Sequence, residues 1–331
     1  MKRMNRLGCG MVLWGIIWVA SLPMLALAPD ASAADFPAKG RAIQIVVNYA
    51  AGGATDVGVR ILAAELEKVL DTKIEVVNKP GASGQIGATY TSKAKPDGYT
   101  IGAVNLPALN VSYLDPAREA VYTRKDFIPL ALQVIDPGLI AVRADSPYQT
   151  LQDVIDAAKT NPGKVTVTTT GLQSTEHFWM MRFQKLTGTQ LALVHFQGSA
   201  PAMIAILGKK IDVLCGNVSD VTPHVKTGEI RVLGVMDDQR SSFLPEGVKT
   251  LKEQGIPIVG GSMRGYVLPA KTPQEIVDLL SAAMKKALAS REVKEKMFNM
   301  GLTWRYMDQK QFEKLWDELD EMMIKLIPEM R

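Results

Sequence analysis

The sequence predicts an α/β protein of two lobes, because short strands and helices alternate along it in two separate series. The chain has 331 residues, which corresponds to two domains at roughly 150 residues each. Charged residues make up 22% of it, close to the usual share of about a quarter, so a disordered or collagen-like chain is excluded. Strand–helix–strand order indicates parallel sheets with helices on their faces.

The first series extends over residues 43–104. Its predicted strands, rich in β-branched residues, are 43–47, 74–77 and 99–104. After the first strand, small residues predict a turn, and Thr55 is predicted to cap a helix with apolar residues at helical spacing as far as Leu70. A Pro/Gly loop at 78–84 precedes a second helix, which is predicted to end near Lys95.

The second series begins at Thr150, which is predicted to cap a helix together with Asp153 three residues later. Asn161-Pro162-Gly163 ends that helix. The predicted strands are 165–169, 191–195, 211–214 and 230–235. A helix is predicted after the first of them.

The C-terminal part is predicted to be helical. Thr272, Pro273 and Glu275 combine a cap, a proline at the first helical position and an acid in the first turn. Apolar residues at helical spacing from Phe312 to Leu326 form one stripe. Packing against the core is the expected role of this stripe, and a partner-binding face is the alternative.

The N-terminus has the pattern of a secretory signal. Three basic residues open the chain, and no charge follows until Asp30. The apolar run between them breaks at Pro23, and Ala31-Ser32-Ala33 has the small-x-small form of a cleavage site. We expect residues 1–33 to be a signal peptide cleaved after Ala33. An uncleaved membrane anchor is the alternative, which Pro23 disfavours.

Composition excludes several functions. The chain has only three histidines and two cysteines, which disfavours a zinc site, an iron–sulfur site or a disulfide framework. Cys215, the one thiol after the signal, is expected to be buried. A net charge of +4 is too small to suggest a nucleic-acid partner. Since neither a hydrolase triad nor a dinucleotide fingerprint emerges, we expect no enzyme, no metal and no cofactor.

Two loops could bind an anion, one in each series. The first holds the residues Ala51, Gly52, Gly53, Thr55 and Asp56 between a strand and a helix. Its glycines allow a ligand close to the backbone, and the N–H groups at the helix start favour a negative charge. Asp56 would cap or orient the loop, because it would repel a carboxylate. A tight turn without a ligand is the alternative.

The second loop also follows a strand and opens a helix. Its candidate residues are Thr170, Gly171, Ser174 and Thr175, with His177 at the start of the helix. Ligands bind beyond the carboxyl ends of strands in open α/β sheets, so the two loops would face each other across a cleft. Helix capping by the hydroxyl groups without a ligand is the alternative. Adjacent Glu176 and His177 do not form an acid–base relay, because neighbouring helical residues do not face one another.

Several strings in the expected order resemble the solute-binding receptors of tripartite tricarboxylate transporters, the Bug-type receptors. The strings are Ala50–Asp56, Asn78–Ala88, Lys95–Thr100, Asp126–Pro129, Asn161–Lys164, Gly198–Ala202 and Gly228–Leu233. Each string alone is weak, but together they cover nearly the whole chain after the signal. Near the expected cleft the chain departs from the family pattern at Asn48-Tyr49, at Gln173 in place of a glycine, and at the turn 114–118.

The resemblance implies a type II-like periplasmic-binding-protein fold, each lobe a sheet flanked by helices. Lobe 1 would comprise residues 34–139 and 259–331, and lobe 2 would comprise residues 140–258. A small carboxylate would bind between the lobes and be delivered to the membrane subunits of the transporter by a periplasmic, monomeric receptor. Both loops carry over as the site, and Asn105, Ser199 and Asn217 are further ligand-binding candidates. Because no Arg or Lys cluster is present, we expect a mono- or dicarboxylate. A carboxylate sensor and an enzyme on the same fold are the alternatives.

Overall fold

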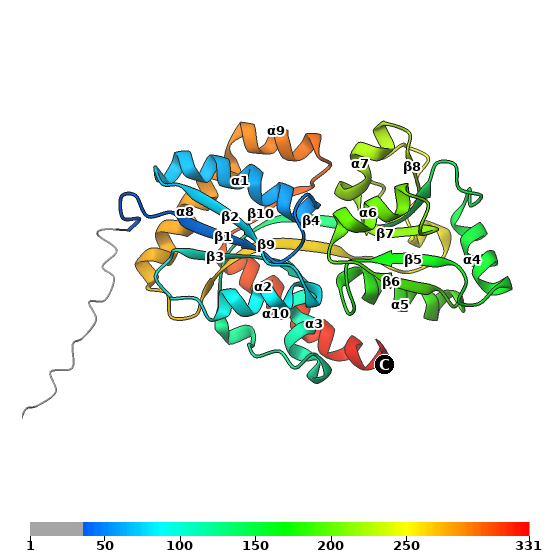
Figure 1. The fold of residues 1–331 in the computed structure, drawn as a ribbon, viewed down its shortest axis with the longest axis horizontal. Helices are drawn as coiled ribbons and strands as arrows, with labels where there is room; N and C mark the ends of the chain where they lie inside the picture. The colour runs from blue at the N-terminus through cyan, green and yellow to red at the C-terminus, as the bar shows by residue number, and fades with distance from the viewer. Residues whose placement is uncertain (1–35, 331) are drawn as a thin grey trace, which may run out of the picture.

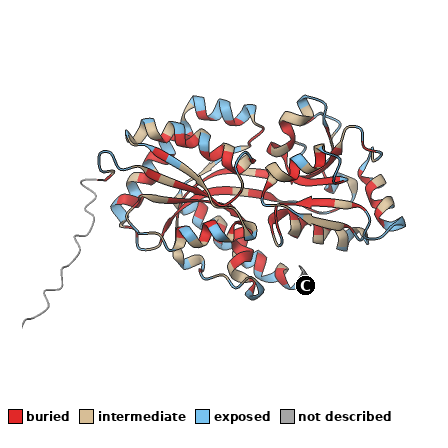
Figure 2. Ribbon diagram, viewed as in Figure 1, coloured by how far each residue is buried: buried red, intermediate tan, exposed pale blue. Residues whose placement is uncertain are grey.

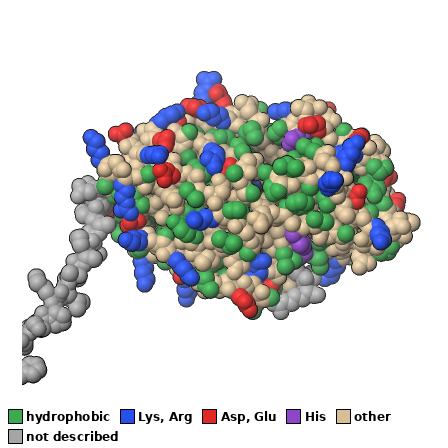
Figure 3. All heavy atoms as spheres, viewed as in Figure 1, with side chains coloured by type: hydrophobic (Ala, Val, Ile, Leu, Met, Phe, Trp, Pro, Cys, Tyr) green, Lys and Arg blue, Asp and Glu red, His purple; other side chains and the backbone are tan. Residues whose placement is uncertain are grey.

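A computed structural model describes residues 36–330, so the predicted signal peptide and its cleavage site lie outside the described residues. The chain forms two α/β lobes side by side, joined by long strands (Figure 1). The two-lobed periplasmic-binding-protein fold is therefore confirmed. Lys and Arg side chains are scattered over the face that Figure 3 shows, with Asp and Glu among them.

Lobe 1 has a sheet in which β1 pairs in parallel with β2 and β3, and β9 continues the sheet antiparallel to β3. Its strands are β1 (Ile43–Val47), β2 (Ile74–Asn78), β3 (Thr100–Leu106), β9 (Gly261–Pro269) and β10 (Trp304–Met307). Its helices are α1 (Ala54–Leu70), α2 (Gln85–Ser92), α3 (Ala108–Leu114), α8 (Gln274–Ala289), α9 (Arg291–Asn299) and α10 (Gln309–Leu326).

Lobe 2 has a second sheet, in which β5 lies between β6 and β7 and pairs in parallel with both. Its strands are β5 (Thr166–Thr169), β6 (Ala192–His195), β7 (Val213–Asn217) and β8 (Ile230–Met236). Its helices are α4 (Leu151–Thr160), α5 (Thr175–Thr187), α6 (Ser199–Leu207) and α7 (Val218–Lys226). The capping box predicted for Thr150 and Asp153 is present at the start of α4.

The 17-residue strand β4 (Phe127–Arg143) belongs to both sheets. It pairs with β9 as far as Pro137, and with β7 and β8 from Gly138 onward. Neither β4 nor β9 is predicted as a strand from the sequence, and α6 and α7 are not predicted either. Residues 127–143 contain two prolines and a glycine, which mask the strand pattern.

Each lobe has its own buried core (Figure 2). The apolar stripe of α10 packs into the protein through Phe312, Trp316, Leu319 and Met323, whereas Met322, predicted to belong to it, is exposed; the buried part serves two cores. Phe312 and Trp316 pack with Phe127 in lobe 1, whereas Met323 and Ile327 pack into the main core of lobe 2. The last helix therefore lies across both lobes.

Two predicted helix caps are wrong. Helix α1 begins after Gly53 without a side-chain cap, and Thr55 lies inside its first turn. Helix α8 begins after Pro273, and the Thr272 hydroxyl donates instead to the carbonyl oxygen of Pro269 at 2.8 Å. In both places the hydroxyl group has a partner elsewhere in the fold.

Candidate functional site

The first predicted loop is held in shape by Asp56. The buried carboxylate accepts hydrogen bonds from the Gly52 N–H at 2.9 Å, from Arg60 Nε at 3.0 Å and from Asn78 Nδ2 at 2.9 Å. Burial would raise the pKa of Asp56, but the hydrogen bonds from Arg60, Gly52 and Asn78 outweigh it and lower the pKa below its ordinary value. With these partners, Asp56 is placed as the residue that orients the loop.

Thr55 points into lobe 1, where Asn105 Nδ2 donates to its hydroxyl oxygen at 3.1 Å. Both side chains are buried. Asn105 is a residue of β3 itself, one position from its end, and does not follow the strand. This pair ties the start of α1 to the carboxyl end of β3.

Two helices, one from each lobe, begin beside the same pocket without a side-chain cap. Helix α1 begins after Gly53, and α6 begins after Gly198. The two starts lie close together, because a Cβ atom added to Gly53 would lie 2.7 Å from Ser199 Oγ and 3.7 Å from the Ala200 nitrogen. Unsatisfied N–H groups at helix starts favour an anion, so this junction suits a carboxylate.

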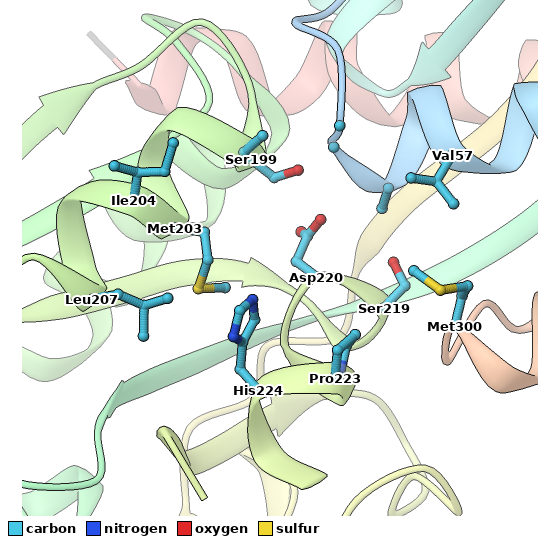
Figure 4. A pocket seen from close by; sticks show the side chains of 14 residues that line it. Val57, Ser199, Met203, Ile204, Leu207, Ser219, Asp220, Pro223, His224 and Met300 are labelled. Carbon is cyan, nitrogen blue, oxygen red and sulfur yellow. The ribbon is translucent and has the colours of Figure 1, made fainter. Parts of the chain in front are cut away.

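The pocket has a volume of about 330 Å³ and lies between the lobes (Figure 4). Lobe 1 contributes Gly52, Gly53, Ala54, Val57 and Met300, and lobe 2 contributes Ser199, Ala200, Met203, Ile204, Leu207, Ser219, Asp220, Pro223 and His224. Most of these side chains are apolar. Of the predicted site residues, Gly52, Gly53 and Ser199 line this pocket.

The polar side chains of the second predicted loop form most of their hydrogen bonds with other residues of lobe 2. Ser174 Oγ caps α5 by accepting the His177 N–H at 3.2 Å. Thr170 bonds to the Glu176 carboxylate, and Asn217 Nδ2 donates to Glu176 Oε1 at 3.3 Å. Burial raises the pKa of Glu176. Sequence reasoning missed this role of Glu176, because an acid in the first turn of a helix is usually solvated.

The remaining loop residues lie close to these contacts. Thr175 is the buried first residue of α5, and Gly171 packs against Ser83 of lobe 1. His177 Nδ1 accepts the Gln173 N–H at 2.7 Å, which places the ring proton on Nε2. Burial lowers the pKa of His177 to about 4, with a smaller contribution from His195. Of the described residues, neither Thr175, Gly171 nor His177 lines the pocket of Figure 4.

The lobes contact each other along one rim of the cleft, and Gln173 and the turn 114–118, where the chain departs from the family pattern, take part. Gln173 Nε2 of lobe 2 donates to Asp115 Oδ2 of lobe 1 at 2.7 Å. Arg118 Nη1 donates to the Leu172 carbonyl oxygen at 3.1 Å, and Ser83 Oγ donates to the same oxygen. We call these contacts the rim contacts. They hold the lobes together on this side of the cleft.

A buried ion pair lies where the crossing strands pass between the lobes. Arg264 of β9 donates from Nη1 to Asp136 Oδ2 of β4 at 2.5 Å, and the Ser219 N–H donates to Asp136 Oδ1 at 3.2 Å. Both charged side chains are buried. Since Ser219 also lines the pocket, α7 is fixed to the crossing strands behind it.

The described residues hold neither a cluster of metal ligands nor a membrane-spanning helix. Residues 36–330 contain no group of three or more His, Cys, Asp or Glu placed to bind a metal ion. Within the same range, no helix is long and apolar enough to span a membrane. Cys215 is buried in β7, as predicted, and burial raises the pKa of its thiol.

Two lobes with a pocket between them, and helix starts at it from both sides, are typical of the solute-binding proteins of the periplasmic-binding-protein class. Residues 59–330 match the model of the tripartite tricarboxylate transporter family receptor, TctC. The chain belongs to this family, whose members are solute-binding receptors and not enzymes.

Individual relatives agree with this assignment. The chain is 34% identical over 298 residues to the "UPF0065 protein in gbd 5'region" of Cupriavidus necator, covering 88% of each chain. It is 30% identical over 281 residues to protein BugT of Bordetella pertussis, covering 84% of this chain and 85% of BugT.

Two solved structures with bound acids have the same fold. The R. palustris protein Rpa4515 with adipate has a TM-score of 0.82 at 26% identity, covering 89% of this chain and 98% of that one. MatC of Rhodopseudomonas palustris with bound malate has a TM-score of 0.81 at 26% identity, covering 87% and 99%. Carboxylate ligands thus occur in similar proteins.

Proposed function

We propose that this protein is a periplasmic receptor that captures a small carboxylate between its lobes and delivers it to the membrane subunits of a tripartite transporter. The observation that carries the proposal is the junction of two uncapped helix starts, from α1 and α6, on one pocket between the lobes. The malate and adipate in the similar structures support it.

The mechanism is closure of the lobes. Lobe 1 (34–139 and 259–331) and lobe 2 (140–258) would open at the crossing strands and close on the ligand. Closure brings the N–H groups of both helix starts onto one carboxylate, so the ligand binds the closed state more tightly and shifts the population toward it. The receptor would act as a monomer after cleavage near Ala33.

Within this proposal the predicted site residues have different roles. Gly52, Gly53 and Ser199 would contact the ligand, with Ala51 beside them. Asp56 would orient the first loop. The remaining candidates would shape and support the far side of the cleft: Thr55, Asn105, Thr170, Gly171, Ser174, Thr175, His177 and Asn217.

A thermal-shift screen against mono-, di- and tricarboxylates tests the proposal. A ligand at 100 times its Kd stabilises the folded protein by about 2.7 kcal/mol, which raises Tm by several degrees. Gly53→Val should abolish the shift, because the added side chain would occupy the space beside Ser199 and the α6 start. Gly247→Val is the matched control, since a Cβ atom there meets nothing within 4 Å.

Two results would overturn the proposal. One is that no carboxylate raises Tm of the unmodified protein. The other is that Gly53→Val and Gly247→Val bind a stabilising acid equally well.

A further inference from the structure

The electrostatic character of the pocket indicates more about the ligand. Among the fourteen described residues that line the pocket, none is Lys or Arg, and Asp220 is the one acid. His224, the other titratable side chain there, bonds through Nδ1 to Glu229 Oε2 at 2.9 Å. The charged side chain available to a ligand is therefore a carboxylate.

Only one oxygen of Asp220 is used by the fold. As the third residue of α7, Asp220 accepts through Oδ2 from the Asn217 N–H at 2.9 Å and from Asn217 Nδ2 at 3.3 Å. Its Oδ1 has no hydrogen-bond partner among residues 36–330. In Figure 4 this carboxylate points into the space between Ser199 and Val57. Capping of α7 thus leaves one acceptor free in the pocket.

The surroundings balance this charge only in part, because Arg264 feels the charge of Asp220 but is bonded to another acid. The nearby cation, Arg264, is held by Asp136 at 2.5 Å. Two further acids, Asp136 and Glu176, feel the charge of Asp220, which adds to burial in raising the pKa of each. A second carboxylate of a ligand would be repelled here, whereas a cationic group would be attracted.

We propose that the ligand is an amino carboxylate, a small acid that also carries an ammonium group. This inference rests on the proposed function. The carboxylate binds at the two helix starts, beside Gly53 and Ser199. The ammonium group donates to Asp220 Oδ1. The hydrocarbon body between them packs against the apolar wall of Met203, Leu207 and Met300.

Matched ligands test this by calorimetry and thermal shift on the full mature chain. The set is 6-aminohexanoate, hexanoate and adipate, which share a six-carbon chain but end in ammonium, methyl and carboxylate. Leucine and 4-methylpentanoate form a second pair that differs only in the ammonium group. We expect the amino member of at least one set to bind about tenfold or more tighter than its partners, as for a hydrogen bond to a charged group.

The variant Asp220→Asn removes the charge but keeps an acceptor for the Asn217 N–H, so α7 stays capped. It should weaken binding of the amino member about tenfold and leave adipate unchanged or tighter. An unfolding curve of the variant checks that it folds.

The outcomes separate the two proposals. If hexanoate or adipate binds as tightly as every amino member, or if Asp220→Asn leaves the amino member unaffected, this inference is overturned and carboxylate capture stands. If no acid in either set or in the wider screen binds, carboxylate capture fails and this inference with it.

Discussion

Replacing Gln173 by glycine should open the lobes without weakening the fold. Gln173 has φ of +58°, in the left-handed region that glycine adopts freely, and its side chain donates to Asp115 across the cleft. The substitution relieves the left-handed conformation, a gain of about 1 kcal/mol. It also removes a hydrogen bond to a carboxylate, a loss of about 1.5 kcal/mol or more. The gain acts on folding, whereas the loss acts on lobe closure.

The closed population should therefore fall about tenfold relative to the open one, since 1.4 kcal/mol is a factor of about 10. Small-angle scattering of the ligand-free protein measures this as a larger radius of gyration. The affinity for a stabilising acid should fall by up to about the same factor, because binding must then supply the energy of closure. The free energy of unfolding from urea curves should stay within about 1 kcal/mol of the unmodified value.

Gln173→Asn is the matched control. Asparagine tolerates the left-handed conformation but is one methylene shorter, so it tests the hydrogen bond separately from the backbone. Both variants should open the lobes. Scattering curves identical to that of the unmodified protein would refute a closing role for this contact.

Three other perturbations have definite expected results. Arg264→Met should destabilise the protein by about 3–5 kcal/mol in urea unfolding, because it leaves Asp136 buried without its ion-pair partner. Adding Asp136→Asn should recover part of this loss. If it recovers none, the buried ion pair is not the cause of the destabilisation. Since the pKa of His177 is about 4 in the folded protein and about 6.5 when unfolded, the unfolded chain binds the proton first, and stability should fall by about 2 kcal/mol from pH 6.5 to pH 4. His177→Gln should reduce that slope, and an unchanged pH profile would show that another group is responsible. Gly171→Ala should lower Tm, because φ is +139° there and the added Cβ would contact Ser83; an unaltered Tm would show that the loop relaxes freely.

The strands of both series could be predicted because they are short, rich in β-branched residues and bounded by turns. The strand β4 could not, because Pro129, Pro137 and Gly138 interrupt it. The strand is long because one half of it pairs with strands of lobe 1 and the other half with strands of lobe 2. Pairing between residues far apart in sequence leaves no local signal.

The first loop of the candidate site could also be predicted from the sequence, since Gly52 and Gly53 lie between a strand and a helix. Asp220 and Glu176 were not. Each is an acid in the first turn of a helix, and this local pattern is the same whether the side chain is solvated or faces a pocket. What distinguishes them is burial and the position of the opposite lobe.

The division of α10 between two cores affects the order in which the chain can fold. Phe312 and Trp316 complete lobe 1, and Met323 and Ile327 complete lobe 2, yet these residues follow the other members of both cores in the sequence. A growing chain therefore carries two unfinished cores until α10 has been synthesised. A chain cut off before α10 would lack side chains from both cores at once, so a truncated product would be a good substrate for proteases.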